Sequence, residues 1–328
     1  MKALVLEEPG KIEGLKVISN REKPIPKENE IRVKVFYSAL NPSDYQVATY
    51  SDLVSERKRV LGLDVAGVVD AVGSGVNNFN VGDRVYYLRS IENLDGGFAE
   101  YACTTAHTAS KLPKELPFEV AAAVPGAGFT AYQAIIQKLR VQAGKTILIH
   151  GGAGGVGGNA IQLAKLSGLT VYTTCLGKDI EYVKSLGADH AIDFEKEDVY
   201  AVLSKLTKER GVDYVLNTIG SESATNDIEY ALAFGGEIVV TAGFPESKSL
   251  RFYDKGISLH EIALGAAHTK GDFKAQCNLA HIGNKFAQLL VDKKISPPKL
   301  TIISMEEIPE YLVKMKQGKI TGKVVAKI

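Results

Sequence analysis

The chain has few of the features that attach a protein to a metal, a membrane or a nucleic acid. Its 3 cysteines, Cys103, Cys175 and Cys277, lie far apart and form no Cys-x-x-Cys pair, so the sequence indicates neither a disulfide framework nor a structural zinc knuckle. Lys and Arg number 39 against 38 Asp and Glu, so no overall field attracts nucleic acid or an anionic membrane.

Long apolar runs are absent as well. None approaches the roughly 18–20 residues of a membrane span, and the first residues, 1–8, have the pattern of a strand rather than of a signal peptide. We therefore expect a cytoplasmic protein without a nucleic-acid or membrane partner.

The 328 residues have room for two domains and change their pattern near residue 118. Before it, segments 31–37, 65–73 and 83–87 contain alternating apolar and polar residues or short apolar stretches, which are typical of strands. After it, strands alternate with helices, which predicts a parallel sheet covered on both faces. The expected strands are 145–150, 170–175, 190–193, 213–217 and 236–241, and the expected helices are 155–167, 178–186, 197–208 and 223–233. A strand at 256–264, a long helix at 272–292 and a terminal strand at 322–328, which could rejoin the first domain, follow.

A glycine-rich segment at 151–157 is the most informative part of the chain. An apolar strand ends there and a helix begins, and Gly152, Gly154 and Gly157 have the G-x-G-x-x-G spacing. Glycine lets the backbone turn tightly and approach a pyrophosphate, which the helix N-terminus attracts. We predict that this loop binds a dinucleotide, through the three glycines together with Ala153, Gly155 and Val156; the alternative is a loop without a ligand. His150, just before it, is expected to be a packed imidazole.

Four motifs, at 61–69, 81–85, 151–157 and 322–325, occur in an order that resembles the medium-chain dehydrogenase/reductase superfamily. The chain is most similar to its zinc-independent, zeta-crystallin-like quinone oxidoreductase branch. The resemblance implies an α/β protein with a GroES-like β-rich catalytic domain at 1–118 and a Rossmann domain with a doubly wound parallel sheet at 119–268. Residues 269–328 would return to the catalytic domain, and the active site would lie in the cleft between the two domains.

The zinc ligands of the superfamily's alcohol dehydrogenases have no counterparts here. Asn41 stands where those enzymes carry a cysteine, and Leu63-Asp64 stands where they carry His-Glu. Segment 125–132 lacks the second cysteine, and the lobe for a structural zinc is missing before 96–101. Because a catalytic zinc needs three protein ligands, we expect no metal. Without a Lewis acid, alcohol oxidation is difficult, whereas reducing a quinone or a conjugated C=C needs only one or two hydrogen bonds to the developing anion.

The resemblance places Asn41 beside the nicotinamide and the substrate, although an Asn before Pro42 is also a common turn residue. Tyr45 could donate a hydrogen bond or a proton to the product, or be an ordinary tyrosine near a loop. We predict Asn41 and Tyr45 as the catalytic residues. Asp44 and Asp64 are expected to fix loops by accepting backbone hydrogen bonds.

The strand at 170–175 indicates which nicotinamide cofactor binds. NAD-binding Rossmann domains place a carboxylate at the tip of this strand, and here there is none. Thr174 and Lys178 could bind a 2′-phosphate instead, so we predict NADPH. The alternative is that Lys178 is an ordinary solvated lysine, and the chain departs from some relatives at Phe194, where they have a tyrosine.

Further cofactor contacts are implied by the resemblance and by the rule that ligands bind at the carboxyl ends of parallel strands. Lys323 either reaches the cofactor phosphates or only caps the returning strand. The predicted contacts are Thr130, Asn217, Ile219, Ala242, Gly243, Phe244 and Lys323.

The leading hypothesis is an NADPH-dependent reductase of quinones or of α,β-unsaturated carbonyl compounds (enones and enals). An enoyl-thioester reductase, a nicotinamide-binding sensor or structural protein with little turnover, and a zinc alcohol dehydrogenase are the alternatives. The apolar edge strand at 256–264 would expose pairing groups unless a second subunit covered it. Relatives commonly dimerise there, so we also expect a homodimer.

Overall fold

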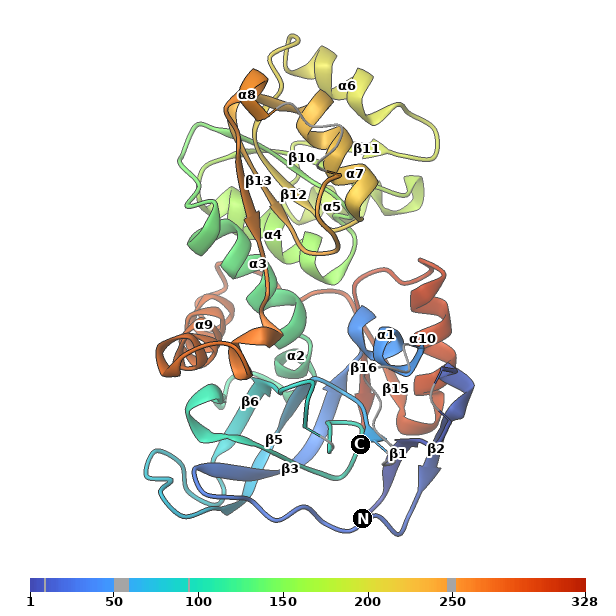
Figure 1. Ribbon diagram of the computed structural model, residues 1–328, viewed down its shortest axis with the longest axis vertical. Coiled ribbons are helices and arrows are strands. Elements are labelled where there is room, and N and C mark those ends of the chain that lie inside the picture. The colour runs from blue at the N-terminus through green and yellow to red at the C-terminus, as the bar shows by residue number, and fades with distance from the viewer. Residues whose placement is uncertain (9, 50–58, 94, 247–251) are drawn as a thin grey trace. The chain divides into compact units, whose positions relative to one another are not determined.

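The computed structural model describes residues 1–8, 10–49, 59–93, 95–246 and 252–328. Its internal contacts divide the chain into two compact units, each described here by itself (Figure 1). Unit 1 comprises residues 1–129, 264–293 and 297–328, and unit 2 comprises residues 130–263 and 294–296.

Unit 1 is built on a seven-stranded sheet with the order β15-β16-β3-β5-β6-β8, in which β7 also pairs with β3. A three-stranded sheet, β2-β1-β4, accompanies it. The alternation seen at 31–37 produces a long strand whose buried positions include Ile31, Val33 and Val35. The strands are β1 Ala3–Leu6, β2 Leu15–Ile18, β3 Glu30–Ala39, β4 Arg59–Val60, β5 Asp64–Val72, β6 Arg84–Leu88, β7 Tyr101–Thr105, β8 Ser110–Lys111, β15 Leu300–Ser304 and β16 Lys323–Lys327.

The predicted terminal strand is confirmed as β16. It pairs antiparallel with β3, with Val325 opposite Ala39, and parallel with β15. Because β16 is buried along most of its length, the end of the chain belongs to the core of unit 1. The helices of this unit are α1 Pro42–Thr49, α2 Phe118–Ala122, α9 Phe273–Val291 and α10 Ile308–Lys316, with short turns η1 Ile12–Gly14, η3 Ala106–Thr108, η4 Pro125–Phe129, η8 Gly265–His268 and η9 Met305–Glu307.

Unit 2 contains a six-stranded parallel sheet with the order β11-β10-β9-β12-β13-β14. Numbered along the unit, this is the 3-2-1-4-5-6 order of a Rossmann fold. The strands are β9 Thr146–Ile149, β10 Thr170–Cys175, β11 His190–Asp193, β12 Val212–Asn217, β13 Leu232–Val240 and β14 Ser258–Glu261. The helices are α3 Thr130–Tyr132, α4 Gly155–Leu166, α5 Ile180–Ser185, α6 Val199–Leu206, α7 Ser221–Asn226 and α8 Phe252–Lys255, with turns η5 Gln133–Lys138, η6 Gly177–Asp179 and η7 Asp227–Ala231.

The predicted fold class, a β-rich GroES-like domain with a doubly wound Rossmann domain, is confirmed. Some boundaries differ from the expectation: β14, expected at 256–264, is found at Ser258–Glu261, and the largest difference is at the start of β13. β13 begins at Leu232 rather than near 236, because Leu232 already pairs with Val212 before a register shift in β12. The helix expected at 223–233 therefore ends at Ala231.

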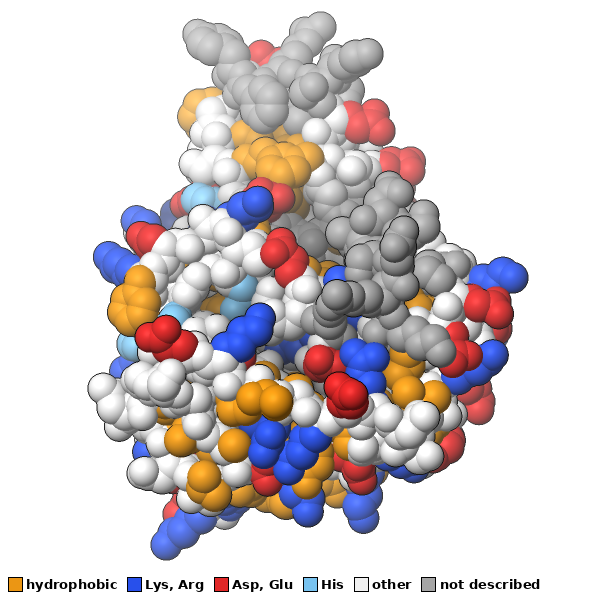
Figure 2. All heavy atoms as spheres, turned by 60° about the horizontal axis from the view of Figure 1, so that its bottom comes forward, with side chains coloured by type: hydrophobic (Ala, Val, Ile, Leu, Met, Phe, Trp, Pro, Cys, Tyr) orange, Lys and Arg blue, Asp and Glu red, His pale blue; other side chains and the backbone are white. Residues whose placement is uncertain are grey.

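The surface agrees with the balanced charge of the sequence. On the face drawn in Figure 2, acidic and basic side chains are interspersed and neither sign forms a continuous patch. In the part of the chain that the structure describes, no helix combines the length and apolarity needed to cross a bilayer. Cys103, Cys175 and Cys277 are all free thiols.

Candidate active site

The glycine loop connects the end of β9 to the start of α4. Gly151 has φ +65°, a conformation that favours glycine. A Cβ on Gly152 would lie 2.2 Å from Thr173 Oγ1, and a Cβ on Gly157 would lie 2.2 Å from the carbonyl oxygen of Gly151. These two glycines are therefore required by close packing inside the loop.

Gly154 has a different role from its two neighbours in the motif. It is the N-cap of α4, and a Cβ there would meet only the carbonyl oxygen of Gly151, at 3.3 Å. The side of the backbone at Gly154 is thus open, beside a helix start whose first N–H groups have no partner within the helix. Gly155 and Val156, in that first turn, are partly exposed. An open cradle at a helix N-terminus fits a pyrophosphate.

Two more loops lie at the carboxyl ends of the parallel strands, as predicted. Ile219 after β12 and Phe244 after β13 are 59% and 50% exposed, unusually high values for large apolar side chains. The two loops meet at Gly243, where a Cβ would lie 2.7 Å from Ser221 Oγ. Ala242 is exposed beside them. These apolar side chains are available to a ligand at this end of the sheet.

The predicted 2′-phosphate contacts lie at the tip of β10 but differ in accessibility. Lys178 is exposed, whereas Thr174 is buried and its hydroxyl bonds to the Gly151 amide and to His150. Both assignments stay predictions. The structure adds Lys196, whose Nζ lies 3.6 Å from the position of a Cβ on Gly177 and 3.6 Å from Asp193 Oδ2. Sequence reasoning missed Lys196 because it follows the third strand, not the second.

In unit 1, Asn41 belongs to a buried polar cluster that we call the Lys323 cluster, made of Asn41, Asp44, Asp64 and Lys323. The Lys323 ammonium donates to Asn41 Oδ1 at 2.8 Å and to the Leu40 carbonyl at 2.9 Å, and forms an ion pair with Asp64 Oδ2 at 3.3 Å. Asn41 Nδ2 donates to the same Asp64 oxygen at 2.8 Å. The Asn41 amide is therefore held in one orientation, with its oxygen toward the ammonium.

Both carboxylates of the Lys323 cluster accept backbone hydrogen bonds, as predicted. Asp64 Oδ1 accepts from the Gly126 N–H at 2.7 Å, and Asp44 accepts from the N–H groups of Asn41 and Gly62 at 2.8 and 3.1 Å. Burial raises the pKa of Asp64. Burial, with a smaller effect of the neighbouring Asp64 charge, raises the pKa of Asp44 to about 7 against the lowering effect of its backbone hydrogen bonds.

The Lys323 cluster does not fit a zinc ion. It offers carboxylate and amide oxygens rather than the thiolates and imidazole that zinc prefers. The two oxygens that face inward, Asn41 Oδ1 and Asp64 Oδ2, already contact the ammonium of Lys323, and a divalent cation there would be repelled by that charge. Across the described ranges, no three His, Cys, Asp or Glu side chains are grouped to hold a metal ion.

The other predicted residues occupy less informative positions. Tyr45, on α1, is partly buried and packs against the hydrophobic core of unit 1. Thr130 begins α3 in unit 2 and is buried. Lys323 has all three of its recorded contacts inside unit 1, so its predicted role at the cofactor phosphates stays a prediction. His150 is buried and hydrogen-bonded, in agreement with its expected packed role.

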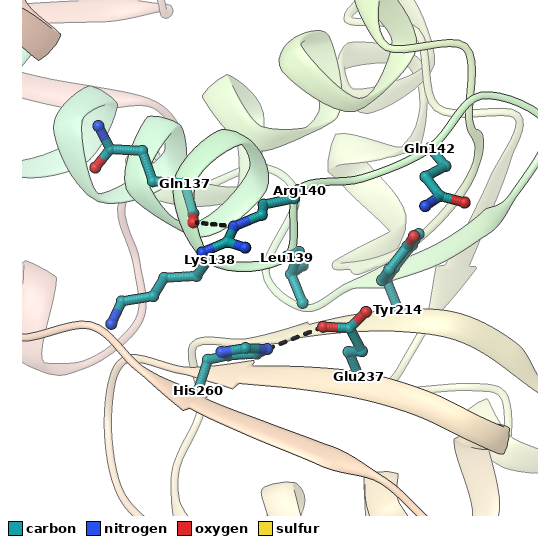
Figure 3. Close-up of a pocket in the computed structure, with 8 residues that line it drawn as sticks. All are labelled: Gln137, Lys138, Leu139, Arg140, Gln142, Tyr214, Glu237 and His260. Carbon is teal, nitrogen blue, oxygen red and sulfur yellow. Dashed lines mark hydrogen bonds and ion pairs between the residues drawn. The ribbon is translucent and has the colours of Figure 1, made fainter.

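A cavity of about 420 Å³ in unit 2 lies apart from the predicted site residues (Figure 3). Its walls include Lys138 at the end of η5, Arg140 just after it, and a His260–Glu237 pair at 2.9 Å on β14 and β13. None of its lining residues is a predicted site residue. It therefore adds no group to the candidate active site.

Comparisons with known proteins agree with this geometry. The family model for an alcohol dehydrogenase GroES-like domain matches residues 27–114, and that for a zinc-binding dehydrogenase matches residues 155–280. The quinone oxidoreductase of Pongo abelii is 35% identical over 247 residues, covering 73% of this chain and 72% of its own. A 2-methylene-furan-3-one reductase of Solanum lycopersicum is 37% identical over 263 residues, covering 77% of this chain and 65% of its own.

Solved structures of oxidoreductases share this fold over almost the whole chain. The quinone oxidoreductase from Coxiella burnetii has a TM-score of 0.85 at 29% identity and covers 100% of this chain and 99% of its own. The CurK enoyl reductase has a TM-score of 0.86 at 26% identity, covering 99% and 98%.

The protein is an oxidoreductase that uses a nicotinamide cofactor, as the fold, the open glycine loop and the similarity to known oxidoreductases together indicate. The chain belongs to the medium-chain dehydrogenase/reductase superfamily and, within it, to the quinone oxidoreductase branch.

Proposed function

We propose that this protein reduces quinones or α,β-unsaturated carbonyl compounds with NADPH. The observation that carries the proposal is the Lys323 cluster, in which a lysine ammonium contacts Asn41, at the position of a cysteine ligand in the superfamily's zinc alcohol dehydrogenases, and Asp64, next to the position of their histidine. A protein without that Lewis acid is suited to acceptors that need only hydrogen bonds and a nearby positive charge.

The bound NADPH supplies a hydride. The glycine loop binds the pyrophosphate through the open backbone at Gly154 and the N-terminus of α4. Ile219, Ala242 and Phe244 give apolar contacts along the cofactor, with Thr130, Asn217 and Gly243 as the further proposed contacts.

In unit 1, we assign the Asn41 amide to the substrate, through the Nδ2 hydrogen whose internal bond, to the Ala39 carbonyl, is long at 3.4 Å. Tyr45 is the proposed hydrogen-bond or proton donor. Lys323 acts through Asn41 rather than by touching the substrate, because its ammonium is buried and already bonded. Its hydrogen bond to the amide oxygen, at 2.8 Å, polarises the amide, so that an Asn41 N–H donates more strongly to the negative charge that develops on a quinone or carbonyl oxygen.

The preference for NADPH rests on positive charge at the tips of β10 and β11. Lys178 and Lys196 are both exposed there, and a 2′-phosphate would pair with them. Phe194, 51% exposed at the end of β11, offers a flat apolar surface for the adenine. The two carboxylates of this region, Asp179 and Asp193, are buried, and Asp193 is paired with Lys196.

The deciding experiment measures oxidation of NADPH and of NADH with a panel of quinones, enones, enals and one enoyl-thioester. We expect a higher kcat/KM with NADPH and turnover of quinones or enones. Preference for NADH would overturn the cofactor assignment. Cofactor binding without turnover across the panel would indicate a sensor or structural protein instead.

An enoyl-thioester reductase is the second candidate. The fold similarity to the CurK enoyl reductase favours it. A preference for the thioester over the free enone by more than about tenfold in kcat/KM, which corresponds to about 1.4 kcal/mol of transition-state binding, would establish this second function.

We also propose a cytoplasmic homodimer. β14 pairs with β13 at the end of the sheet order, and an open edge of this kind is commonly covered by another strand. Free thiols are typical of a reducing compartment. Light scattering at micromolar concentration should give twice the mass of 35.3 kDa for one chain; the single-chain mass would contradict the dimer.

A further inference from the structure

Four polar side chains are buried directly beneath the strand ends of unit 2. His150, Thr174, Asn217 and Asp227 are 5%, 3%, 0% and 0% exposed. They come from the end of β9, from β10, from β12 and from η7. Buried polar groups are costly unless they are fully paired, so their partners indicate what they are for.

The first branch of this network leads to the glycine loop. His150 Nε2 lies 2.8 Å from Asp227 Oδ1, and His150 Nδ1 lies 3.2 Å from Thr174 Oγ1. We assign the tautomer in which Nε2–H donates to the Asp227 carboxylate, so that Nδ1 accepts from the Thr174 hydroxyl. That same hydroxyl accepts the Gly151 N–H at 3.1 Å. The chain of bonds therefore ends on the backbone at the start of the glycine loop.

The second branch leads to the loop after β12. Asn217 Nδ2 donates to Asp227 Oδ2 at 2.7 Å, and Asn217 Oδ1 accepts from the N–H groups of Ile219 and Gly220 at 3.0 and 3.2 Å. The amide cannot be turned over without losing all three bonds. Asp227 thus fixes the backbone of this second loop as well.

A third contact closes the arrangement. Thr218 Oγ1 donates to the carbonyl oxygen of His150 at 3.1 Å, so the two loops are also joined directly. β9 and β12, from which they start, are the strands on either side of the point where the sheet order reverses. Ligands of doubly wound sheets bind at that point.

We propose that the His150–Asp227 pair, with Thr174 and Asn217, is a positioning device that holds both cofactor-binding loops in their binding conformation. The inference rests on the proposed cofactor site and adds residues to it that act through the backbone. It also assigns the Thr174 hydroxyl to the loop rather than to a 2′-phosphate, because its hydrogen and an acceptor lone pair are both used internally. The device holds the pyrophosphate side, which NADPH and NADH share, so it does not discriminate between them.

Thr174→Val tests the first branch. Valine keeps the shape but leaves the Gly151 N–H without its acceptor, and an unpaired buried donor costs about 1.4 kcal/mol or more, a tenfold change. In equilibrium titrations we expect the Kd values for NADPH and for NADH to rise by the same factor, about tenfold. Thr174→Ser, which keeps the hydroxyl, should restore both. Weakening of NADPH alone would show a 2′-phosphate contact and overturn the proposal, as would unchanged affinity for both.

Asp227→Asn tests the carboxylate that joins the two branches, and it hardly changes the side-chain volume. With its NH2 group toward Asn217, two donors meet; with its NH2 group toward His150, the ring must change tautomer, which leaves the Thr174 hydroxyl hydrogen without its acceptor. Both Kd values should therefore rise. The double variant Asn217→Asp/Asp227→Asn exchanges donor and acceptor and restores the complementary pattern. We expect it to recover most of the lost affinity; a double variant worse than Asp227→Asn would overturn the proposal.

Amide hydrogen exchange of the cofactor-free protein separates this inference from the proposed function. We expect faster exchange at Gly151 in Thr174→Val, and at Gly151 or at Ile219 and Gly220 in Asp227→Asn. This readout needs no cofactor, so failure of the wild-type protein to bind NADPH and NADH would refute the proposed function alone. Unchanged exchange in both variants would refute the positioning device alone.

Discussion

Lys323 Nζ lies 2.8 Å from Asn41 Oδ1, although 282 residues separate them in the chain. The contact follows from the sheet, because β16 returns to pair with the end of β3, directly before Asn41. A cation from the last strand thereby sits behind an amide from the first part of the chain. The proposed chemistry of unit 1 depends on this return.

Replacing Lys323 by Met removes the charge but keeps most of the side-chain volume. Asp64, fully buried, would lose its ion pair, and breaking a buried pair costs about 3–5 kcal/mol of the free energy of unfolding. We expect that loss in urea denaturation, and a fall in kcat of about tenfold or more because the charge behind Asn41 is gone.

Two variants control this prediction. Lys323→Arg keeps the charge and should recover part of both losses, whereas Lys327→Met changes the exposed last residue of the same strand and should change neither. A folded Lys323→Met protein with wild-type kcat would show that the ammonium does not act through Asn41.

The raised pKa of Asp44 predicts that the free energy of unfolding depends on pH. Its pKa is raised to about 7 in the folded protein, mainly by burial, from an ordinary value of 3.8. The protonated form is thus favoured by folding, so this contribution is fully present below pH 4 and is lost as pH rises through 7. Its full size is about 4 kcal/mol, at about 1.4 kcal/mol for each pH unit.

The comparison of the wild type with Asp44→Asn isolates this effect. Asparagine does not titrate, so we expect the difference between their free energies of unfolding to shift toward the variant as pH rises from 4 to 8. Asp64 titrates in both proteins, so the difference reports Asp44 together with its coupling to Asp64. A difference that is constant over this range would contradict a raised Asp44 pKa.

The sheet of unit 2 could be predicted from the sequence because its physical causes are local. Strands buried on both faces give short apolar runs, and the helices between them give a different period. Four of the six expected strands were found within one residue of their bounds, and β14, expected at 256–264, is shorter. β13 starts early since its first pairing with Val212 precedes a register shift, which no local pattern encodes.

The partners of the site residues could not be predicted in the same way. Lys323 and Asn41 meet through a strand return, and Thr174 turns its hydroxyl inward to Gly151 and His150. Residue type and spacing suggested a polar contact in each case. The direction of the side chain depends on pairing across the sheet, which leaves no periodic trace in the sequence.

Lys178 should determine the preference for NADPH. A hydrogen bond to a charged group contributes about 1.5 kcal/mol, so Lys178→Ala should raise the Kd for NADPH about tenfold and leave that for NADH unchanged. Lys184→Ala, on α5 and also exposed, is the matched control and should alter neither. Equal effects of the Lys178 change on both cofactors would mean that the lysine does not contact the 2′-phosphate.

Gly154 and Gly157 belong to one motif, yet their substitutions should fail in different ways. A Cβ on Gly157 would lie 2.2 Å from the Gly151 carbonyl oxygen, so Gly157→Ala should lower the free energy of unfolding by about 1–3 kcal/mol, as overpacking does. Gly154 has extended dihedrals, φ −83° and ψ 173°, and more space. Gly154→Ala should therefore cost about 1 kcal/mol or less as an N-cap change.

Gly154→Ala, which should change stability little, should have a large effect on cofactor binding. In Gly154→Ala the added methyl occupies the open side of the cradle, and we expect a well-folded protein whose Kd for both cofactors rises at least about tenfold, since the pyrophosphate can no longer approach the backbone. Thermal unfolding and cofactor titration of the two variants together measure this. If Gly154→Ala bound NADPH as the wild type does, the pyrophosphate would have to dock elsewhere than at the start of α4.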